Sequence, residues 1–176
     1  MIARSHGQLK GTGMAIAGIV VPIVLLPFVA IFTAISIPAA LVKVKCAAQQ
    51  QVCNARQKQL GVDLHMYAAD NDNQYPTPDK WCDLLKPYYK DERTLICPSA
   101  EQEQRHYAIN PQAEPNSPSD VVLLFETKGG RNQSGGPTLL TTDNHCEKGC
   151  NILFNDVTAR FVRIEDINKL RWTPKQ

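Results

Sequence analysis

Six cysteines and one histidine are the residues of this chain whose types and spacing could do chemistry. The cysteines are Cys46, Cys53, Cys82, Cys97, Cys146 and Cys150, and His145 directly precedes the fifth of them. His145, Cys146 and Cys150 could supply three metal ligands, because imidazole and thiolate are groups that zinc prefers. A fourth ligand is not evident nearby, so we favour a local disulfide or a capped loop and expect no metal site.

Other sequence motifs that would indicate catalysis are missing. The chain has no Cys-x-x-Cys-His haem motif, double-cysteine zinc knuckle, phosphate-binding loop or nucleophile elbow. His65 and His106 are single histidines on predicted elements, which are more often packed or solvated than catalytic. We therefore expect a protein that is not an enzyme and that has no cofactor.

The positions of the cysteines limit how they can pair. Cys46 and Cys53 are seven residues apart on one predicted helix, so their Cα atoms would lie about 10.5 Å apart. A disulfide needs a separation of roughly 4.4–6.8 Å, so these two cannot bond to each other. We predict Cys82–Cys97, which are close enough in sequence to clip a loop, and Cys146–Cys150, which flank a turn containing Gly149. Cys46 would then remain free, and Cys53 would be free or buried against the head.

The chain contains a long uncharged segment near its N-terminus. No charged residue occurs between Lys10 and Lys43, and most of the residues there are apolar. Because a bilayer core needs about 20 helical residues, this pattern predicts a transmembrane helix at 13–42 after a short tail at 1–12. The run is longer than the apolar region of a cleavable signal peptide, so we expect it to be retained.

The orientation of that expected span depends on two signals that conflict. Lys43, Lys45, Arg56 and Lys58 follow the run, and basic residues there favour a cytoplasmic C-terminal side. The even number of cysteines on that same side instead indicates an oxidising compartment, where disulfides persist. We favour the second signal and expect a single-pass protein of the bacterial inner membrane with a periplasmic C-terminal domain. If that side were cytosolic, metal binding would be the alternative for the cysteines.

The helix is expected to continue beyond the apolar run as an amphipathic helix at 43–72. A stripe with helical spacing would pack it on the head, formed by Cys46, Cys53, Leu60, Leu64 and Tyr67. The acidic and amide residues at 70–73 favour a solvated helix end over a calcium loop, because the glutamate and spacing of such a loop are missing.

The remainder of the chain, 73–176, predicts a mixed head. A short helix precedes Pro87, and strand patterns occur at 106–109, 121–125, 151–154 and 159–164. The last two strands are separated by a turn-like spacing and should form an antiparallel hairpin. We expect an α+β fold in which a small antiparallel sheet packs on the long N-terminal helix.

Several ordered motifs resemble the bacterial prepilin-like proteins, and more narrowly the pseudopilin G-like proteins of type II secretion. The segment IPAAL at 37–41 leads into CNARQKQLGVDLHMYAADND at 53–72, followed by WCDLLKPY at 81–88, CPS at 97–99, YAIN at 107–110 and GCNILFND at 149–156. The resemblance implies a pilin-like head on a long helix and a structural role in the cell envelope. Two features depart from the family: no acid precedes Asp63, so the prepilin cleavage motif is missing, and Val157 replaces the usual turn glycine.

Charge and composition limit the remaining functions. The formal net charge is only +2, and no basic stripe with interleaved aromatic residues occurs, which argues against a nucleic-acid partner. We expect a pseudopilin-like structural protein whose partners are the lipid bilayer and other envelope proteins or copies of itself. The alternative is a single-pass accessory subunit that uses the pilin-like head as a binding module. A metal-dependent envelope enzyme built around His145 is the least favoured possibility.

Overall fold

The computed structural model describes residues 12–100 and 105–175 and divides the chain into two units, Met1–Lys43 and Val44–Gln176. One helix, α1 (Thr12–Asp70), contributes to both units. The expected tail at 1–12 lies outside the described residues except for Thr12. The second unit is α+β and contains a four-stranded antiparallel sheet.

The expected membrane span is corrected by the structure. Within the described part of the chain, no helix is long and apolar enough to cross a membrane. The transmembrane helix at 13–42 and the single-pass inner-membrane localisation are therefore wrong.

The C-terminal end of α1 follows from local backbone chemistry. Asp72 and Asn73 adopt left-handed backbone conformations, with φ angles of 51° and 54°. Aspartate and asparagine tolerate this conformation better than other non-glycine residues, and it reverses the chain at a helix end. The Asn73 N–H donates to the Ala68 carbonyl at 2.9 Å, which satisfies one of the carbonyls that the helix end leaves unpaired.

The sheet is built from four consecutive antiparallel strands in the order in which they occur in the sequence. They are β1 (Tyr107–Ile109), β2 (Val122–Glu126), β3 (Gly149–Phe154) and β4 (Ala159–Arg163). Their positions are close to the runs predicted from the sequence. β2 and β3 are buried along their whole length, because both faces of the sheet are covered.

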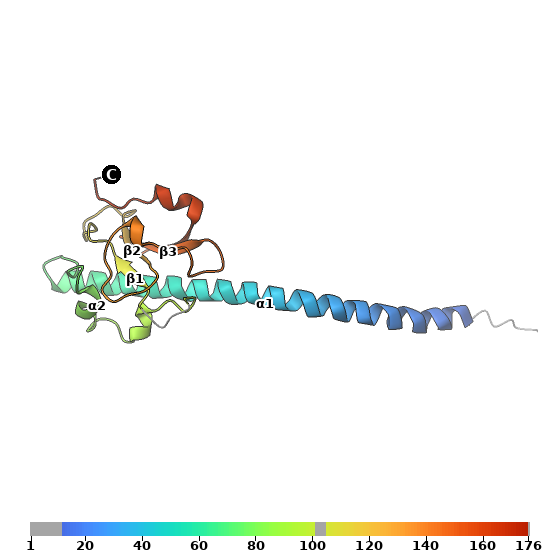
Figure 1. Cartoon of the computed structure of the whole chain (residues 1–176). Coiled ribbons are helices and arrows are strands. Elements are labelled where there is room, and N and C mark those ends of the chain that lie inside the picture. Colours follow the sequence, from blue (N-terminus) through green and yellow to red (C-terminus); the bar gives the residue numbers. More distant parts are fainter. Residues whose placement is uncertain (1–11, 101–104, 176) are drawn as a thin grey trace, which may run out of the picture. The chain divides into compact units, whose positions relative to one another are not determined.

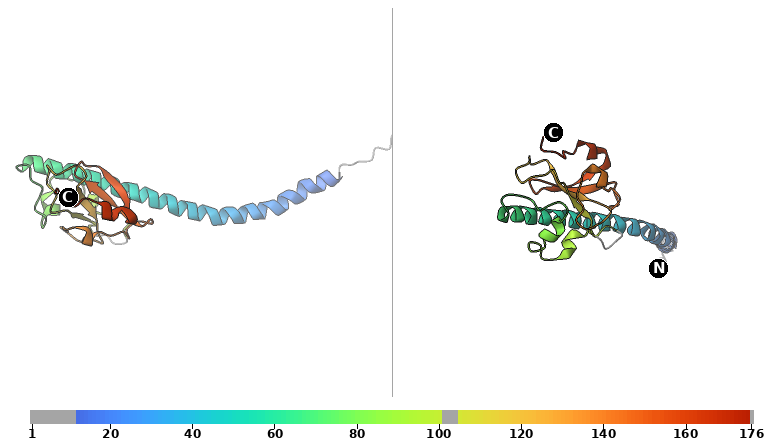
Figure 2. Two further views of the ribbon diagram at one scale, coloured as in Figure 1. Left: turned by 90° about the horizontal axis from the view of Figure 1, so that it is seen from above. Right: turned by 60° about the vertical axis from the view of Figure 1, so that its left-hand side comes forward.

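Two hydrophobic clusters cover the two faces of the sheet. On one face, Cys53, Leu60 and Leu64 of α1 are fully buried in a cluster that also contains Trp81 and Leu153. On the other face, Phe125 and Ile152 pack under the C-terminal segment that includes η3 (Ile164–Lys169). Figures 1 and 2 show the sheet on one side of the C-terminal part of α1 and, on a different side, the segment with α2 (Trp81–Leu84) and η1 (Glu92–Leu95).

The contact between α1 and the closing hairpin is unusually close. A Cβ atom added at Gly61 would lie 3.0 Å from Leu153 Cδ2 and 3.1 Å from Val157 Cγ1. Glycine at this position therefore lets the helix approach the β3–β4 turn. Val157 itself has a φ of 64°, which a β-branched residue adopts only at an energetic cost.

Candidate functional site: a covalent and polar clasp on the long helix

Two disulfides attach α1 to segments that are distant in the sequence. Cys46 is bonded to Cys146, with a sequence separation of 100, and Cys53 is bonded to Cys97, with a separation of 44. Their Cα–Cα distances of 6.0 Å and 5.2 Å lie in the ordinary range for disulfides. The predicted pairs Cys82–Cys97 and Cys146–Cys150 are therefore wrong, because both bonds cross from the helix to the head.

The two cysteines left unpaired occupy separate buried positions. Cys82 lies in α2, where its backbone N–H donates to Asn132 Oδ1 at 2.8 Å, and burial raises the pKa of its thiol to about 11. Cys150 lies on β3 in the cluster on the far face of the sheet, and burial raises the pKa of its thiol well above the ordinary value. Both thiols remain protonated at neutral pH, so neither is an activated nucleophile.

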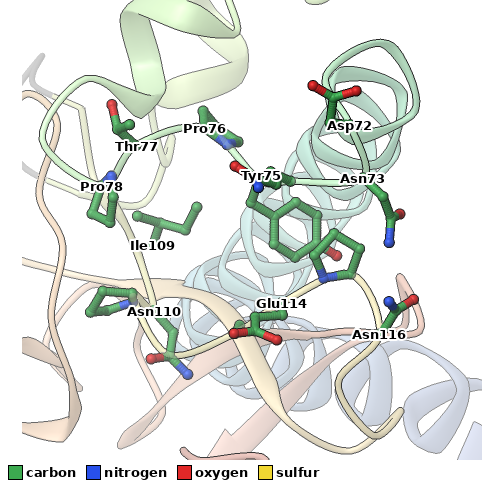
Figure 3. Close-up of a pocket in the computed structure, with 14 residues that line it drawn as sticks. Asp72, Asn73, Tyr75, Pro76, Thr77, Pro78, Ile109, Asn110, Glu114 and Asn116 are labelled. Carbon is green, nitrogen blue, oxygen red and sulfur yellow. The ribbon is translucent and has the colours of Figure 1, made fainter.

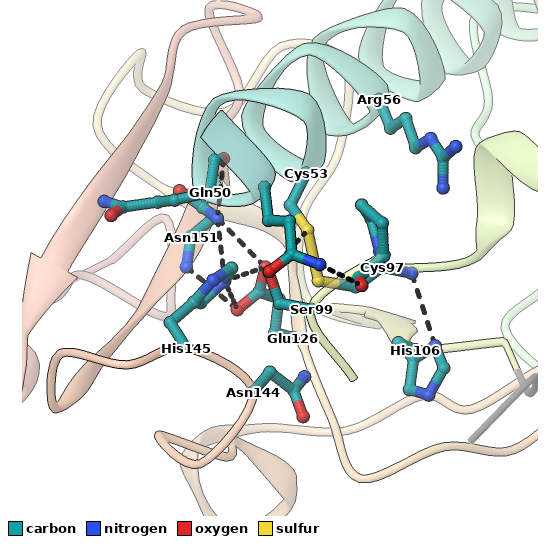
Figure 4. The surroundings of a disulfide bond; sticks show 12 residues. Gln50, Cys53, Arg56, Cys97, Ser99, His106, Glu126, Asn144, His145 and Asn151 are labelled. Carbon is teal, nitrogen blue, oxygen red and sulfur yellow. Dashed lines mark hydrogen bonds and ion pairs between the residues drawn. A yellow bond between two sulfur atoms is a disulfide. The ribbon is translucent and has the colours of Figure 1, made fainter. Parts of the chain in front are cut away.

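A buried polar cluster lies beside the Cys53–Cys97 bond (Figure 4). Glu126, at the end of β2, is fully buried, and its two carboxylate oxygens each lie 2.9 Å from His145 Nε2. Asn151 of β3 donates to the same carboxylate from its backbone N–H at 3.2 Å and from Nδ2 at 3.0 Å. Asn151 Nδ2 also lies 3.0 Å from His145 Nε2, so the imidazole, the carboxylate and the amide form one connected polar group.

The strands position this cluster under the helix by alternation of their side chains. Phe125 and Ile152 point toward the far cluster, so their neighbours Glu126 and Asn151 point toward α1. Burying a carboxylate without partners is costly, and His145 and Asn151 supply those partners. The His145 ring is held in turn by its contacts with Glu126 and with Asn151 Nδ2.

Side chains of α1 complete the attachment by donating hydrogen bonds to backbone carbonyls of the head. Gln57 Nε2, which is buried, donates to the Asn151 carbonyl at 3.0 Å. Asn54 Nδ2 donates to the Ala159 carbonyl and Gln49 Nε2 to the Pro98 carbonyl, both at 3.0 Å. We call the two disulfides together with Gln57, Glu126, His145 and Asn151 the clasp.

His106 connects the clasp to the start of β1. The Cys97 N–H donates to His106 Nδ1 at 3.3 Å, so this ring nitrogen acts as an acceptor. Burial lowers the pKa of His106, and the charge of Glu126 opposes that shift. The imidazole is therefore neutral at pH 7 and supports the residue that forms the inner disulfide.

The metal-ligand set suggested by the sequence is not brought together. Cys146 is bonded to Cys46, and Cys150 lies in the cluster on the far face of the sheet. His145 instead joins Cys53, Cys97 and Glu126, and one potential ligand atom from each of these four residues lies within 4.8 Å of the others. Their positions in the sequence are far apart, so spacing did not reveal them. The only signal was Glu126, an acid directly after the apolar run at 121–125.

The residues of the predicted packing stripe lie as follows. Cys53, Leu60 and Leu64 are fully buried, Tyr67 is partly buried against the same cluster, and Cys46 is half-buried at the outer disulfide. His65 contacts Tyr75 Oη and the Asn155 carbonyl through Nε2, each at 3.0 Å. These contacts give the helix a packing role and do not form a reactive group.

An open pocket of about 540 Å³ lies beyond the C-terminal end of α1 (Figure 3). Tyr75, Pro76 and Pro78 line it together with the loop after β1, and its acidic side chains are Asp72 and Glu114. None of the described residues that line it is a histidine, a cysteine or a basic residue. Asp72 and Glu114 are therefore the charged groups that the pocket presents to a ligand.

The part of α1 in the first unit presents exposed apolar side chains. Ile23, Leu25, Leu26, Ile31, Leu41 and Val42 are each between 54% and 66% exposed. At 100° per residue, Leu25 and Leu26 point about 200° and about 300° around the helix from Ile23, so the apolar surface is not confined to one face. A helix that is apolar on all sides is normally buried.

Comparison of the chain with protein-family models, with curated proteins and with solved structures finds no match.

Proposed function

We propose that this protein is a non-catalytic structural subunit, pilin-like in architecture, which assembles with copies of itself through the apolar part of α1. The exposed apolar residues at 23–42 carry this proposal. Leaving them in water costs about 25 cal/mol for each Å² of apolar surface, so burial against neighbouring subunits provides a driving force for assembly. The absence of a single apolar face favours a bundle in which each helix is surrounded by several others.

The clasp supports the same role. A subunit that is held in an assembly by its helix must transmit force from that helix to its head. Two disulfides and the buried hydrogen bond from Gln57 to the Asn151 carbonyl join α1 to β3 and to the loops at 97 and 146. Because disulfides constrain the unfolded chain, this attachment withstands conditions that would separate a helix held by packing alone.

The resemblance of the helix and head motifs to pseudopilin G-like proteins supports the proposal in a third way. In that family the long helix is the assembly element and the head is displayed outside it. The two buried, unpaired cysteines, whose thiols are protonated at neutral pH, fit a protein that acts through contacts. The disulfides are compatible with an extracytoplasmic location.

Sedimentation velocity of the purified full chain tests the proposal. The variant Ile23→Glu/Leu26→Glu places charges at two exposed positions of the first unit, so it removes no contact made within the chain. The matched control, Leu139→Glu/Ile164→Glu, changes two exposed apolar residues of the head. We expect the wild type and the control to assemble, and the α1 variant to need at least about tenfold more protein to do so.

Two results would count against the proposal. A wild-type chain that stays monomeric at all concentrations would show that α1 does not assemble with itself. Recovery of the wild type from cells with a fixed set of other proteins and no second copy would favour the accessory-subunit alternative.

A further inference from the structure

We propose that the inner part of the clasp becomes a binding site for a thiophilic divalent cation, with zinc as the best match, when Cys53–Cys97 is reduced. The four ligands would be Cys53 Sγ, Cys97 Sγ, one Glu126 oxygen and His145 Nε2. This inference goes beyond the proposed structural role, because it assigns a metal ion to four side chains that the structural role uses only for internal contacts.

The spacing of the four groups fits tetrahedral coordination. Zinc holds sulfur at about 2.3 Å and nitrogen or oxygen at about 2.0–2.2 Å, so its ligand atoms lie roughly 3.3–3.8 Å from one another. The four atoms here already lie within 4.8 Å of one another. Small side-chain rotations after the S–S bond opens are enough to close the site, and no backbone rearrangement is needed to bring the residues together.

The types of ligand favour zinc over harder ions. Two thiolates and an imidazole are soft or borderline donors, whereas calcium and magnesium prefer oxygen alone. The cation would lie between His145 Nε2 and the Glu126 carboxylate, whose oxygens are each 2.9 Å from that nitrogen. Asn151, which donates to Glu126 from both its backbone and its side chain, would orient the carboxylate as an outer hydrogen-bond donor.

Burial of the four side chains favours a bound cation. Cys53, Cys97 and Glu126 are fully buried, and the His145 side chain is 2% exposed. In this setting an unpaired thiolate or carboxylate is costly, so a cation that neutralises them is held strongly.

The chemical step balances with an external dithiol. The dithiol transfers two electrons and two protons to the Cys53–Cys97 bond, which becomes two thiols while the dithiol becomes a cyclic disulfide. The cation then displaces both thiol protons, which pass to solvent, and His145 binds it through Nε2 as a neutral imidazole with its ring proton on Nδ1. Cys97 leads into half-exposed residues at 98–100, which give a small reductant access from that side.

The outer disulfide offers an internal comparison. Cys146 is exposed and Cys46 half-buried, so their bond is reduced at least as readily as the inner one. Among the described residues, the group of four potential ligands includes neither Cys46 nor Cys146. Reduced Cys46 and Cys146 should therefore bind zinc much more weakly than Cys53 and Cys97.

Zinc uptake by the reduced full chain tests the proposal. The protein is reduced, exposed to excess Zn²⁺, separated from free metal and analysed by elemental mass spectrometry. We expect one equivalent of zinc in the reduced wild type and in Cys46→Ala/Cys146→Ala, and none in the oxidised wild type. Glu126→Gln and Cys53→Ala/Cys97→Ala should each weaken binding at least about tenfold.

A second measurement keeps the test valid if a variant fails to fold. In the reduced wild type, bound zinc should slow alkylation of Cys53 and Cys97 but leave Cys46 and Cys146 reactive, as read by peptide mapping. Substitution by Co²⁺ should give the absorption of a tetrahedral thiolate site. The proposal is overturned if the reduced wild type takes up no zinc, or if zinc protects Cys46 and Cys146 instead.

Discussion

Removal of the inner disulfide should destabilise the head far more than removal of the two unpaired thiols. The perturbation is Cys53→Ala/Cys97→Ala, which opens a loop with a sequence separation of 44. The chain-entropy relation assigns about 4 kcal/mol to closing a loop of this length. Because this loop lies inside the one closed by Cys46–Cys146, the unfolded chain is already constrained, and we expect a loss of about 2–3 kcal/mol in the free energy of unfolding.

The matched control is Cys82→Ala/Cys150→Ala, which truncates two buried sulfur atoms without removing a cross-link. We expect it to cost less than half as much as the first variant. The assay is urea denaturation without reductant, followed by tryptophan fluorescence, since Trp81 and Trp172 both lie in the second unit. The reasoning fails if the control is the more destabilised of the two, or if non-reducing peptide mapping recovers Cys82–Cys97 in the wild type.

Three further predictions concern single positions in the head. Val157→Asn should raise the free energy of unfolding by about 1 kcal/mol, measured by urea denaturation, because asparagine tolerates the left-handed backbone that strains valine. Gly61→Val should lower it in the same assay by about 1–3 kcal/mol, because the added atoms overpack the contact with the β3–β4 turn. His106→Asn should reduce the loss of stability between pH 7 and pH 5. The pKa of His106 is lowered in the native state, so the unfolded chain binds the proton first. The free energy of unfolding of the wild type therefore decreases as the pH drops below about 6.5, the pKa of an unfolded histidine.

Each of these three changes has a control and a contradicting result. Val157→Thr keeps a β-branched side chain, so a gain equal to that of asparagine would show that strain is not the cause. For Gly61→Val, valine has the higher helix propensity, so an unchanged or higher free energy of unfolding would show that overpacking is absent. The control Ala55→Val changes an exposed position of the same helix and should cost less than about 1 kcal/mol. For His106→Asn, the slope of stability against pH can change by at most about 1.4 kcal/mol per pH unit, because one proton is involved. An unchanged slope would assign the acid sensitivity to other groups.

The local parts of the fold could be predicted from the sequence. The continuous apolar run at 121–125 and the strand pattern at 159–164 predicted strands, and Cys53, Leu60 and Leu64 share one face of the helix because of their spacing. These features depend on neighbours in the chain. The uncharged and mostly apolar run at 13–42 predicted a membrane span, and no helix of the described residues provides one.

The clasp could not be predicted, because its contacts are long-range. Spacing favours pairing of nearby cysteines, whereas the two observed bonds join residues 44 and 100 positions apart. Glu126 directly follows an apolar strand pattern, and only the sheet register places it next to Asn151. The fact that Cys46 and Cys53 share a helix face was the one available signal that both face the head.

The most direct test of the proposed assembly is photo-crosslinking from Leu25 between copies of the chain. A benzophenone amino acid replaces Leu25, and chains labelled with ¹⁴N and ¹⁵N are mixed before assembly and irradiated. Self-assembly through α1 predicts mixed-isotope cross-links from position 25 to residues 12–43 of a second copy. Cross-links only within one chain, or only to the head of another copy, would contradict assembly through the apolar part of α1.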